Sequence, residues 1–267
     1  MSAIVLIRGG GDLASGVAIR LLRAGIRVAI TELAQPLAVR RSVAFAEAIY
    51  AGEVSIEGFV GRRVEDPSDT LRILTIFGKQ QVPVIIDPEC LSAQSLHPSV
   101  IVDGRLTKQP PKPIGYSPML YIGLGPGFEA NVNCQAVIET KRGHTLGRVY
   151  WQGHTEADSR LPEGNPQRVL RAPCQGILES ESHIGQHFEP GEIIAYVAGQ
   201  PILAPFPGVL RGLLHPGLEV TLGVKVGDLD PRDDPSMCKL VSDKALAVGG
   251  GVLEAILTKP EVRGTLW

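Results

Sequence analysis

The sequence has little of what would place it in several common classes of protein. Its 267 residues include only four cysteines, which stand far apart and form no C-x-x-C pair. This usage predicts free thiols in a reducing compartment rather than a disulfide framework or a zinc site. Lys and Arg number 26 against 28 Asp and Glu, a net charge of −2. Charge therefore gives no reason to expect a nucleic acid or a membrane surface as partner.

Long hydrophobic runs are also missing. The apolar start at residues 3–7 has no basic segment before it and runs into three glycines, which is not the pattern of a signal peptide. No run approaches the roughly 18 apolar residues of a transmembrane helix. With 44% hydrophobic and 20% charged residues, the composition is that of an ordinary globular protein. We therefore expect a cytoplasmic protein.

The first part of the chain alternates between strand and helix signals. Apolar runs at 3–8, 27–31, 82–86, 100–102 and 120–124 predict buried strands. Helical patterns lie between them, up to Gly25, over 37–50 and over 67–77, and residues 134–151 predict a β-hairpin. Strands alternating with helices indicate right-handed βαβ units. The predicted fold class is α/β, with a Rossmann-like, mostly parallel sheet domain over residues 1–151.

Residues 172–191 reappear in register at 204–223. Seven of the twenty positions are identical, namely Ala172/Ala204, Pro173/Pro205, Gly176/Gly208, Leu178/Leu210, His183/His215, Gly185/Gly217 and Gly191/Gly223. Paired apolar strands between glycine turns resemble the biotinyl/lipoyl-type barrel-sandwich, so we expect a small all-β domain of two similar halves at 168–231. The turn at 197–202 (VAGQPI) holds no lysine, so we expect no covalent biotin or lipoate. Polar residues 152–167 form the expected linker, and 232–267 a helical segment that packs back on the first domain.

A glycine-rich turn follows the first predicted strand and opens the first helix. Residues 9–16 (GGGDLASG) fit G-x-G-x-x-A, in which glycines allow a tight turn and close approach of a pyrophosphate, while the helix N-terminus attracts an anion. Glu32 ends the second strand, where an acidic side chain can bind a ribose hydroxyl. A tight turn that binds nothing is the alternative. The candidate cofactor-binding residues here are Gly9, Gly10, Gly11, Asp12, Ala14 and Glu32.

Two further segments are candidates for contact with an anionic ligand. A second glycine turn, 123–128 (GLGPGF), ends a strand and would border the same crevice if it binds a ligand. The hairpin turn 140–144 (TKRGH) collects a hydroxyl, two cations and an imidazole. A rigid strand-ending turn and a solvent-exposed tip are the respective alternatives. The candidate residues are Gly125, Gly127, Thr140, Arg142 and His144.

Catalytic and metal-ligating residues are not predicted. Asp87 and Asp103 each stand at a strand's carboxyl end, a usual position for active-site carboxylates, and capping of the following helix is the better interpretation for Asp87. His183 and His187 have metal-like spacing only in a helix, and they fall in the β repeat. We therefore expect no metal site, and the catalytic residues stay unknown.

Together these motifs resemble the YqeB-type accessory proteins of the selenium-dependent molybdenum hydroxylase system. The segments that carry the resemblance are 7–16 (IRGGGDLASG), 31–33 (TEL), 40–48 (RRSVAFAEA), 122–128 (IGLGPGF), 137–144 (VIETKRGH) and 249–255 (GGGVLEA). The resemblance implies a role in maturing molybdenum-cofactor hydroxylases of the xanthine dehydrogenase type. It supplies no reaction and no catalytic residue.

Two functions follow from these observations. The first is a maturation factor that holds the molybdenum cofactor or another phosphate-bearing ligand at the glycine loops and delivers it to a molybdenum hydroxylase apoenzyme. The second is an NAD(P)- or flavin-dependent oxidoreductase of the same pathway, favoured by the loop 9–14 and Glu32. Binding of NAD(H), NADP(H) or FAD would raise the melting temperature and distinguish the second from the first.

Overall fold

The computed structural model describes residues 4–158 and 165–266, which divide into two compact units. The first unit comprises residues 4–36, 44–158 and 241–266, and the second comprises 37–43 and 165–240. Residues 159–164 of the expected linker lie outside the described residues. No helix of the described residues is both long and apolar enough to cross a bilayer.

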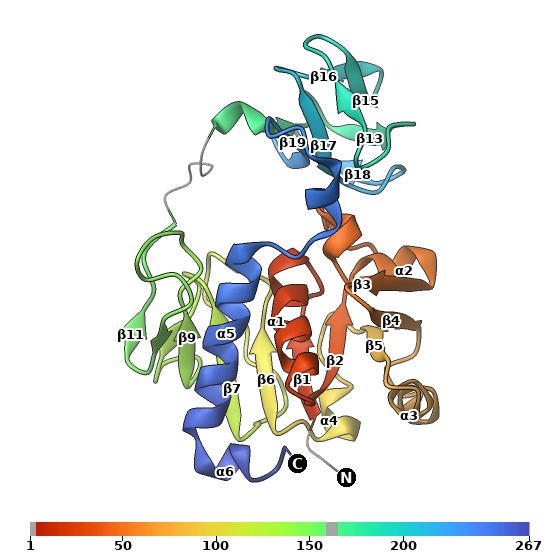
Figure 1. The fold of residues 1–267 in the computed structure, drawn as a ribbon. Coiled ribbons are helices and arrows are strands. Elements are labelled where there is room, and N and C mark those ends of the chain that lie inside the picture. The colour runs from red at the N-terminus through yellow and green to blue at the C-terminus, as the bar shows by residue number, and fades with distance from the viewer. Residues whose placement is uncertain (1–3, 159–164, 267) are drawn as a thin grey trace. The chain divides into compact units, whose positions relative to one another are not determined.

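The first unit is built on one large sheet (Figure 1). Its nine strands lie in the order β10-β9-β7-β6-β1-β2-β5-β4-β3, and β8 and β11 form a separate pair. The inner seven strands run parallel, while β3 and β10 are antiparallel to their neighbours at the two edges. The strands are β1 (Ile4–Arg8), β2 (Arg27–Glu32), β3 (Glu53–Ile56), β4 (Phe59–Val64), β5 (Val82–Ile86), β6 (Val100–Asp103), β7 (Leu120–Leu124), β8 (Glu129–Ala130), β9 (Ala136–Ile138), β10 (Val149–Tyr150) and β11 (Gly153–His154).

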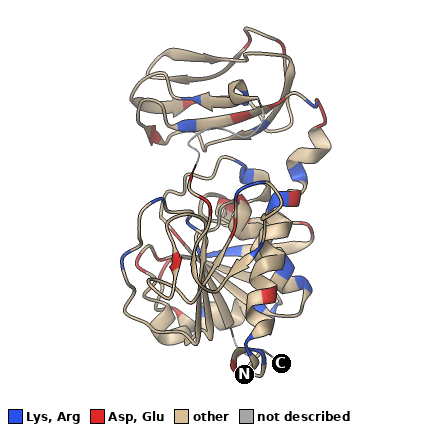
Figure 2. Ribbon diagram, turned by 90° about the vertical axis from the view of Figure 1, so that its left-hand side faces the viewer, with Lys and Arg blue, Asp and Glu red and all other residues tan. Residues whose placement is uncertain are grey.

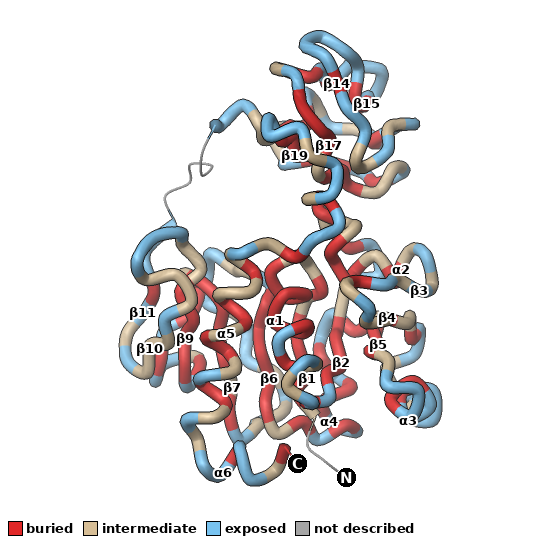
Figure 3. The backbone as a smooth tube through the Cα atoms, in the orientation of Figure 1, coloured by how far each residue is buried: buried red, intermediate tan, exposed pale blue. Residues whose placement is uncertain are grey.

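The helices of this unit follow the expected alternation. They are α1 (Asp12–Arg23), α2 (Glu47–Ala51), α3 (Thr70–Gly78), α4 (Ala93–Leu96), α5 (Asp243–Thr258) and α6 (Pro260–Arg263). Figure 1 shows α1 and α5 side by side against the sheet. Small residues permit this contact, since a Cβ built on Gly16 would lie 2.5 Å from the Cβ of Ala245. The central strands of the sheet are buried, as the red segments of Figure 3 show, whereas β3 and β10 at the edges are partly exposed.

Several predicted elements are confirmed. The strands at β1, β2, β5, β6 and β7 and the helix α1 lie where the apolar patterns placed them. The predicted hairpin at 134–151 is confirmed too, with Val149 opposite Ile138 in an antiparallel pair. The sequence analysis missed the hairpin of β3 and β4, although its turn carries the usual signal, left-handed residues at Glu57 (φ 47°) and Gly58 (φ 89°).

The helix predicted over 37–50 is wrong. Only a 3₁₀ turn, η1 (Arg41–Val43), and the short α2 are helical there. Other partners take the backbone groups that a helix would use: Val39 O accepts from the N–H of Leu213, and Ser15 Oγ accepts from the N–H of Phe45. Residues 37–43 belong to the second unit and 44–50 to the first, so the segment is divided between the two units.

The sheet also corrects the predicted Rossmann-like domain. A Rossmann sheet has the order 3-2-1-4-5-6. Here the parallel strands, counted along the chain, have the order seventh, sixth, fifth, first, second, fourth and third, and both edges are antiparallel. The difference arises because β4 pairs with β3 in a hairpin and with β5, so that β5 lies between β2 and β4.

The second unit consists of two four-stranded sheets, with the orders β12-β19-β17-β14 and β16-β15-β13-β18. Its elements are η1, η2 (Pro166–Arg168), β12 (Val169–Arg171), β13 (Gly176–Glu179), β14 (His187–Phe188), β15 (Ile193–Val197), β16 (Gln200–Leu203), β17 (Gly208–Leu213), β18 (Glu219–Val220), β19 (Lys225–Asp230) and η3 (Pro235–Lys239). Acidic and basic segments lie next to each other on its strands (Figure 2). They include Arg211 on β17, whose Nη1 lies 3.5 Å from Asp230 Oδ2 on β19.

The 32-residue repeat is visible in the hydrogen bonds of this unit. The N–H of Gly185 donates to Leu210 O at 2.8 Å, and the N–H of Gly217, 32 residues further on, donates to Leu178 O at 2.8 Å. Strand pairing repeats in the same way, because β14 pairs with β17 as β18 pairs with β13. Each of these bonds joins one half of the repeat to the other.

The predicted barrel-sandwich of biotinyl/lipoyl type is corrected to this all-β unit of two antiparallel sheets. Its bounds also differ from the expected 168–231. The unit extends to residue 240 and takes in residues 37–43, whereas the sequence placed everything from 232 onward with the first domain. Val39 explains part of this difference, because its carbonyl lies so close to β17 that a Cβ on Gly212 would be 2.8 Å from it.

Candidate functional site

Four ionisable residues end adjacent parallel strands of the first unit. Arg8 ends β1, Glu32 ends β2, Asp87 follows β5 and Asp103 ends β6. Ligands of open α/β sheets bind at this carboxyl edge. Asp87 is a cap, as expected: its two oxygens accept from the N–H groups of Leu91 and Ser92, each at 2.8 Å.

A buried polar cluster forms around Asp103. The side chain of Asp103 is fully buried, and Arg8 is only 4% exposed. Arg8 Nη1 lies 3.1 Å from Asp103 Oδ2, and the hydroxyl of Tyr121 donates to the same oxygen at 2.9 Å. Arg8 Nη1 also donates to the Tyr121 hydroxyl oxygen, at 3.2 Å. The three side chains therefore hold one another, which a buried charge requires.

Arg105 carries this cluster toward solvent. Its Nε lies 2.9 Å from Asp103 Oδ1 and its Nη2 2.7 Å from Oδ2, a bidentate pair, while its side chain remains 34% exposed. Two guanidinium groups face one carboxylate, so the cluster of Arg8, Asp103 and Arg105 has a net charge of +1. An anion close to Arg105 would be attracted by this excess charge.

Two neutral groups accompany the cluster. Burial, and next the negative charge of Asp103, raises the pKa of the Tyr121 hydroxyl. Burial likewise raises the pKa of the Cys90 thiol to about 11, although Arg8 opposes the shift. Near neutral pH both groups therefore keep their protons, and the Tyr121 hydroxyl donates its hydrogen to Asp103.

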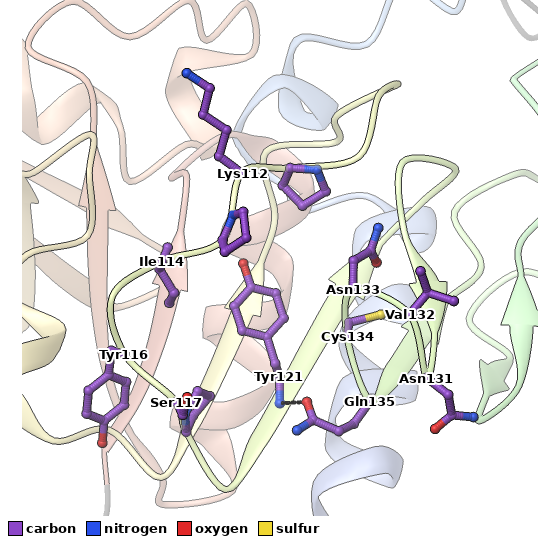
Figure 4. Close-up of a pocket in the computed structure, with 13 residues that line it drawn as sticks. Lys112, Ile114, Tyr116, Ser117, Tyr121, Asn131, Val132, Asn133, Cys134 and Gln135 are labelled. Carbon is purple, nitrogen blue, oxygen red and sulfur yellow. Dashed lines mark hydrogen bonds between the residues drawn. The ribbon is translucent and has the colours of Figure 1, made fainter.

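A pocket of about 490 Å³ lies beside Tyr121 (Figure 4). Figure 4 shows the Tyr121 ring in the middle, with Ile114 and Tyr116 on one side and Asn133 and Cys134 on the other. The backbone N–H of Tyr121 donates to Gln135 Oε1 at 2.7 Å. The lining residues come from the loop after β6, from β7 and from the segment before β9: Pro111, Lys112, Pro113, Ile114, Tyr116, Ser117, Pro118, Tyr121, Asn131, Val132, Asn133, Cys134 and Gln135.

The first glycine loop is held by Glu32 rather than left open. Glu32 Oε1 accepts from the N–H of Gly10 at 2.7 Å, and its Oε2 accepts from the N–H of Leu33 at 2.6 Å. Burial raises the pKa of Glu32, against the effect of these two bonds. The carboxylate therefore accepts hydrogen bonds from the backbone of the loop, where the sequence predicted hydrogen bonds to a ribose.

The other residues of this loop have local roles as well. Gly9 has φ of 89°, and a Cβ on it would lie 3.3 Å from Arg105 Cγ, so the loop approaches the charged cluster closely. Ala14 lies against Gly104, because a Cβ built on Gly104 would be 2.8 Å from the Cβ of Ala14. Asp12 Oδ1 accepts from the N–H of Leu13 at 3.0 Å, and Gly11 is the N-cap of α1.

The second glycine loop lies close to the segment that follows β6. A Cβ on Gly127 would be 2.3 Å from Thr107 O, and one on Gly125 would be 3.0 Å from Thr140 Oγ1. Three predicted residues, Gly125, Gly127 and Thr140, are therefore brought together with the loop at 104–107. The structure explains the glycines by this packing.

The remaining predicted residues point to other roles. Arg142 forms a bidentate pair with Asp243 at the start of α5, with both distances 2.7 Å. His144 is exposed on the same turn. Glu139, buried just before the turn, accepts from the N–H groups of Lys141 and Glu156. The turn is thus tied to its own unit through its backbone and through Arg142.

Sequence reasoning missed Arg8, Arg105, Tyr121 and the pocket. Arg8 carried a signal, because a charged residue closing a buried apolar strand needs a partner. Its partners lie 95 and 113 positions further along the chain, at Asp103 and Tyr121, which no local pattern reveals. Across the part of the chain that the structure describes, no group of three or more His, Cys, Asp or Glu side chains is placed to hold a metal ion.

Comparison with known proteins gives one clear relative. No family model matches the chain. A protein of Escherichia coli K12 named as uncharacterized protein YqeB is 41% identical over 259 residues, which is 95% of this chain. The chain is a YqeB relative. It spans about half the length of that protein, 47%, so activities and partners of the whole protein do not follow from the match.

Among solved structures the likenesses are weak. A succinylglutamate desuccinylase/aspartoacylase of Rhodobacter sphaeroides has a TM-score of 0.26 and 14% identity, covering 85% of each chain. An aspartoacylase family protein of Mesorhizobium loti has 0.24 and 9%, covering 86% of this chain and 85% of its own. The product-bound ectoine utilization protein EutE of Ruegeria pomeroyi has 0.25 and 12%, covering 85% of each chain. At these scores the neighbours' activity does not transfer to this chain.

The hydrogen bonds of the first glycine loop and the strand order of the sheet correct the predicted function and fold class. The similar structures given above are named as desuccinylase/aspartoacylase or ectoine utilization proteins, and none of them is named as a molybdenum hydroxylase maturation factor or an NAD(P)- or flavin-dependent oxidoreductase. They are not biotinyl/lipoyl domains either. The physical reason is local: Glu32 and the backbone bonds of residues 9–11 occupy the place where the sequence put a nucleotide.

Proposed function

We propose that the first unit binds a small organic acid in the pocket beside Tyr121. One observation carries the proposal: the ring of Tyr121 lines a pocket of about 490 Å³, while its hydroxyl belongs to a cluster of net charge +1. Small-molecule sites usually measure about 300–1,000 Å³ and combine an apolar lining with a few convergent polar groups.

The lining fits a ligand with a planar or aliphatic body. Pro111, Pro113, Pro118 and Ile114 present rigid apolar surface opposite the Tyr121 ring, and prolines lose little conformational entropy on binding. Asn133 is held in place, because its amide donates to Gly127 O and accepts from the N–H of Glu129. The body of a ligand would therefore meet a wall that is already ordered.

The charges near the pocket favour a ligand that carries a carboxylate. Lys112 lies on the pocket rim, and among the described residues its ammonium group makes no hydrogen bond or ion pair. Arg105 adds positive charge behind Tyr121. Both charges attract a carboxylate and repel a cation.

The groups inside the pocket favour binding rather than chemistry. Burial raises the pKa of the Cys134 thiol to about 11, and burial also raises that of Tyr121. A protonated thiol is a weak nucleophile. Neither group is a strong nucleophile near neutral pH, so the proposal is one of binding.

Benzoate and benzamide are a matched pair of probes, because they share one shape and differ in charge. We expect saturable chemical-shift changes with millimolar benzoate, and several-fold weaker binding of benzamide. Val132→Trp fills the pocket from an exposed position and should abolish binding, whereas Leu71→Trp, equally exposed on α3, should not. Equal binding of both probes, or binding that survives Val132→Trp, would reject the proposal.

Lys112→Gln tests the charge alone. Removing one rim charge should weaken benzoate binding by about three- to tenfold, the effect of roughly 1 kcal/mol. Lys108→Gln is the matched control, since Lys108 pairs with Asp158 and does not line the pocket. If both variants lose the same affinity for benzoate, the effect comes from the overall charge of the protein, and Lys112 does not contact the ligand.

Several expectations from the sequence stay predictions. These are the tie to the selenium-dependent molybdenum hydroxylase system, a hydroxylase apoenzyme as partner, a molybdenum cofactor, NAD(P) or FAD as ligand, and location in the cytoplasm. No comparison tests them. Co-purification of a retained small molecule with the full chain, followed by mass spectrometry, would do so.

A further inference from the structure

The second unit contains a pocket of its own, of about 790 Å³. It is formed by the turn of the first repeat half, by η3 and by Ser42: Ser42, Glu181, His183, Ile184, Gly185, Gln186, Pro235, Ser236, Cys238 and Lys239 line it. All of these residues belong to the second unit. The volume lies in the upper part of the range for small-ligand sites.

Unpaired charges of both signs surround this pocket. The carboxylate of Glu181, the imidazole of His183 and the ammonium of Lys239 are exposed, and their side chains make no hydrogen bond or ion pair with the described residues. Other charged side chains of this unit do have partners, as Arg168 has Asp228 at 2.8 Å. The pocket rim therefore offers an acid and two bases that the fold itself does not use.

The inner surface is apolar. Cys238 is 3% exposed, and burial raises the pKa of its thiol, so it is a neutral group near pH 7. Ile184 and Pro235 lie around it on the lining. A ligand would thus place an apolar portion inward and its charges at the rim.

The repeat places apolar residues in the second half where this turn has polar ones. Positions 181, 182 and 186 carry Glu, Ser and Gln in the first half, while the equivalent positions in the second half are Leu213, Leu214 and Leu218. Those three leucines are 1%, 1% and 4% exposed. The backbone bonds of Gly185 and Gly217 are nevertheless equivalent, although Gln186 Oε1 of the first half also accepts from the N–H of His183. The same turn thus exists with apolar residues, and only the first half presents polar ones to a pocket.

We propose that this pocket binds a short peptide with both termini free. The N-terminal ammonium group pairs with Glu181, the C-terminal carboxylate pairs with Lys239 and His183, and an apolar side chain enters toward Cys238. Opposite charges on one rim select a zwitterion over a simple acid or amine. A ligand the size of a tripeptide suits the volume.

The probe is the tripeptide Ala-Leu-Ala, compared with its N-acetylated and its C-amidated forms by titration calorimetry on the whole chain. The free peptide should bind saturably, and each modification should weaken binding about three- to tenfold, as expected for the loss of one charge pair. Equal affinity of all three peptides would overturn the proposal. So would the absence of saturable binding of the free peptide up to about 10 mM.

Substitutions assign the two ends. Glu181→Gln should reduce affinity for the free peptide and leave the acetylated form unchanged, while Lys239→Gln should do the same for the amidated form. Glu179→Gln and Lys79→Gln are matched controls at exposed positions that do not line the pocket. Ile184→Trp should block binding, and Ile177→Trp, at an exposed position on β13, should not. If the rim variants behave like their controls, the assignment is wrong.

Discussion

The hydroxyl of Tyr121 donates a hydrogen bond of 2.9 Å to Oδ2 of Asp103, a carboxylate with no exposure to solvent. Tyr121→Phe removes this donor, while Arg8 and Arg105 remain as partners of the same oxygen. We expect a loss of about 0.5–1.5 kcal/mol in the free energy of unfolding, the usual net contribution of one hydrogen bond. Urea unfolding measures it. Tyr196→Phe, whose exposed hydroxyl makes no bond in the described structure, should change stability by less than about 0.5 kcal/mol.

Asp103→Asn should cost more. The substitution leaves the buried guanidinium of Arg8 without its counter-charge, and breaking a buried ion pair costs about 3–5 kcal/mol. Thermal unfolding followed by circular dichroism would register the loss. The surface pair of Arg62 with Glu53 is the comparison, since both side chains are at least one third exposed. Glu53→Gln should cost at most about 1 kcal/mol, and equal costs at the two sites would contradict the burial of the cluster.

Glu32 predicts a pH dependence of stability. Burial raises its pKa in the folded protein, so the folded state binds this proton more tightly than the unfolded state does. Stability contributed by Glu32 is therefore fully present below the unfolded pKa of 4.5 and declines as pH rises through the higher folded pKa. Urea unfolding should be measured for the wild type and for Glu32→Gln from pH 4 to about 7. The free energy of unfolding of the wild type should fall relative to that of Glu32→Gln as pH rises. The opposite slope would show that the backbone bonds of Gly10 and Leu33 outweigh burial.

Gly127 should tolerate no side chain. A Cβ there would lie 2.3 Å from Thr107 O, which is backbone and cannot turn away. Gly127→Ala is expected to destabilise the first unit by about 1–3 kcal/mol. Gly250→Ala is the control: this glycine lies inside α5 with open space at its Cβ, and the exchange should stabilise by about 0.5–1 kcal/mol. Differential scanning calorimetry of both variants makes the comparison.

The repeat predicts equal effects at Gly185 and Gly217. Both have left-handed backbone, with φ of 98° and 89°, and neither has an atom within 4 Å of a built Cβ. Alanine at either position should therefore cost about 1–2 kcal/mol, through the backbone alone. Chemical unfolding of Gly185→Ala and Gly217→Ala should agree within about 0.5 kcal/mol. A clear difference would mean that the two turns are not equivalent.

Local patterns predicted the buried strands and α1, because apolar runs and helical spacing depend on neighbours in the sequence. They failed at residues 37–50, where Leu213 takes a bond that a helix would have used. They also predicted the wrong partner for Glu32. Its carboxylate was expected to bind the ribose of a nucleotide, but it accepts from the N–H of Gly10 in the glycine loop itself. The site around Asp103 joins residues from three strands and two loops. Its composition follows from the sheet order, in which β7, β6 and β1 are neighbours.

The crossed bonds of the repeat have a consequence for the second unit. Gly185 finds its acceptor on Leu210 and Gly217 finds its acceptor on Leu178, so each half closes its turn only against the other. A single half would leave these groups open, and two copies of one half would satisfy them by exchange. The unit therefore has the reciprocal bonding of two identical subunits within a single chain, with leucines at the turn of one half and polar residues at the turn of the other.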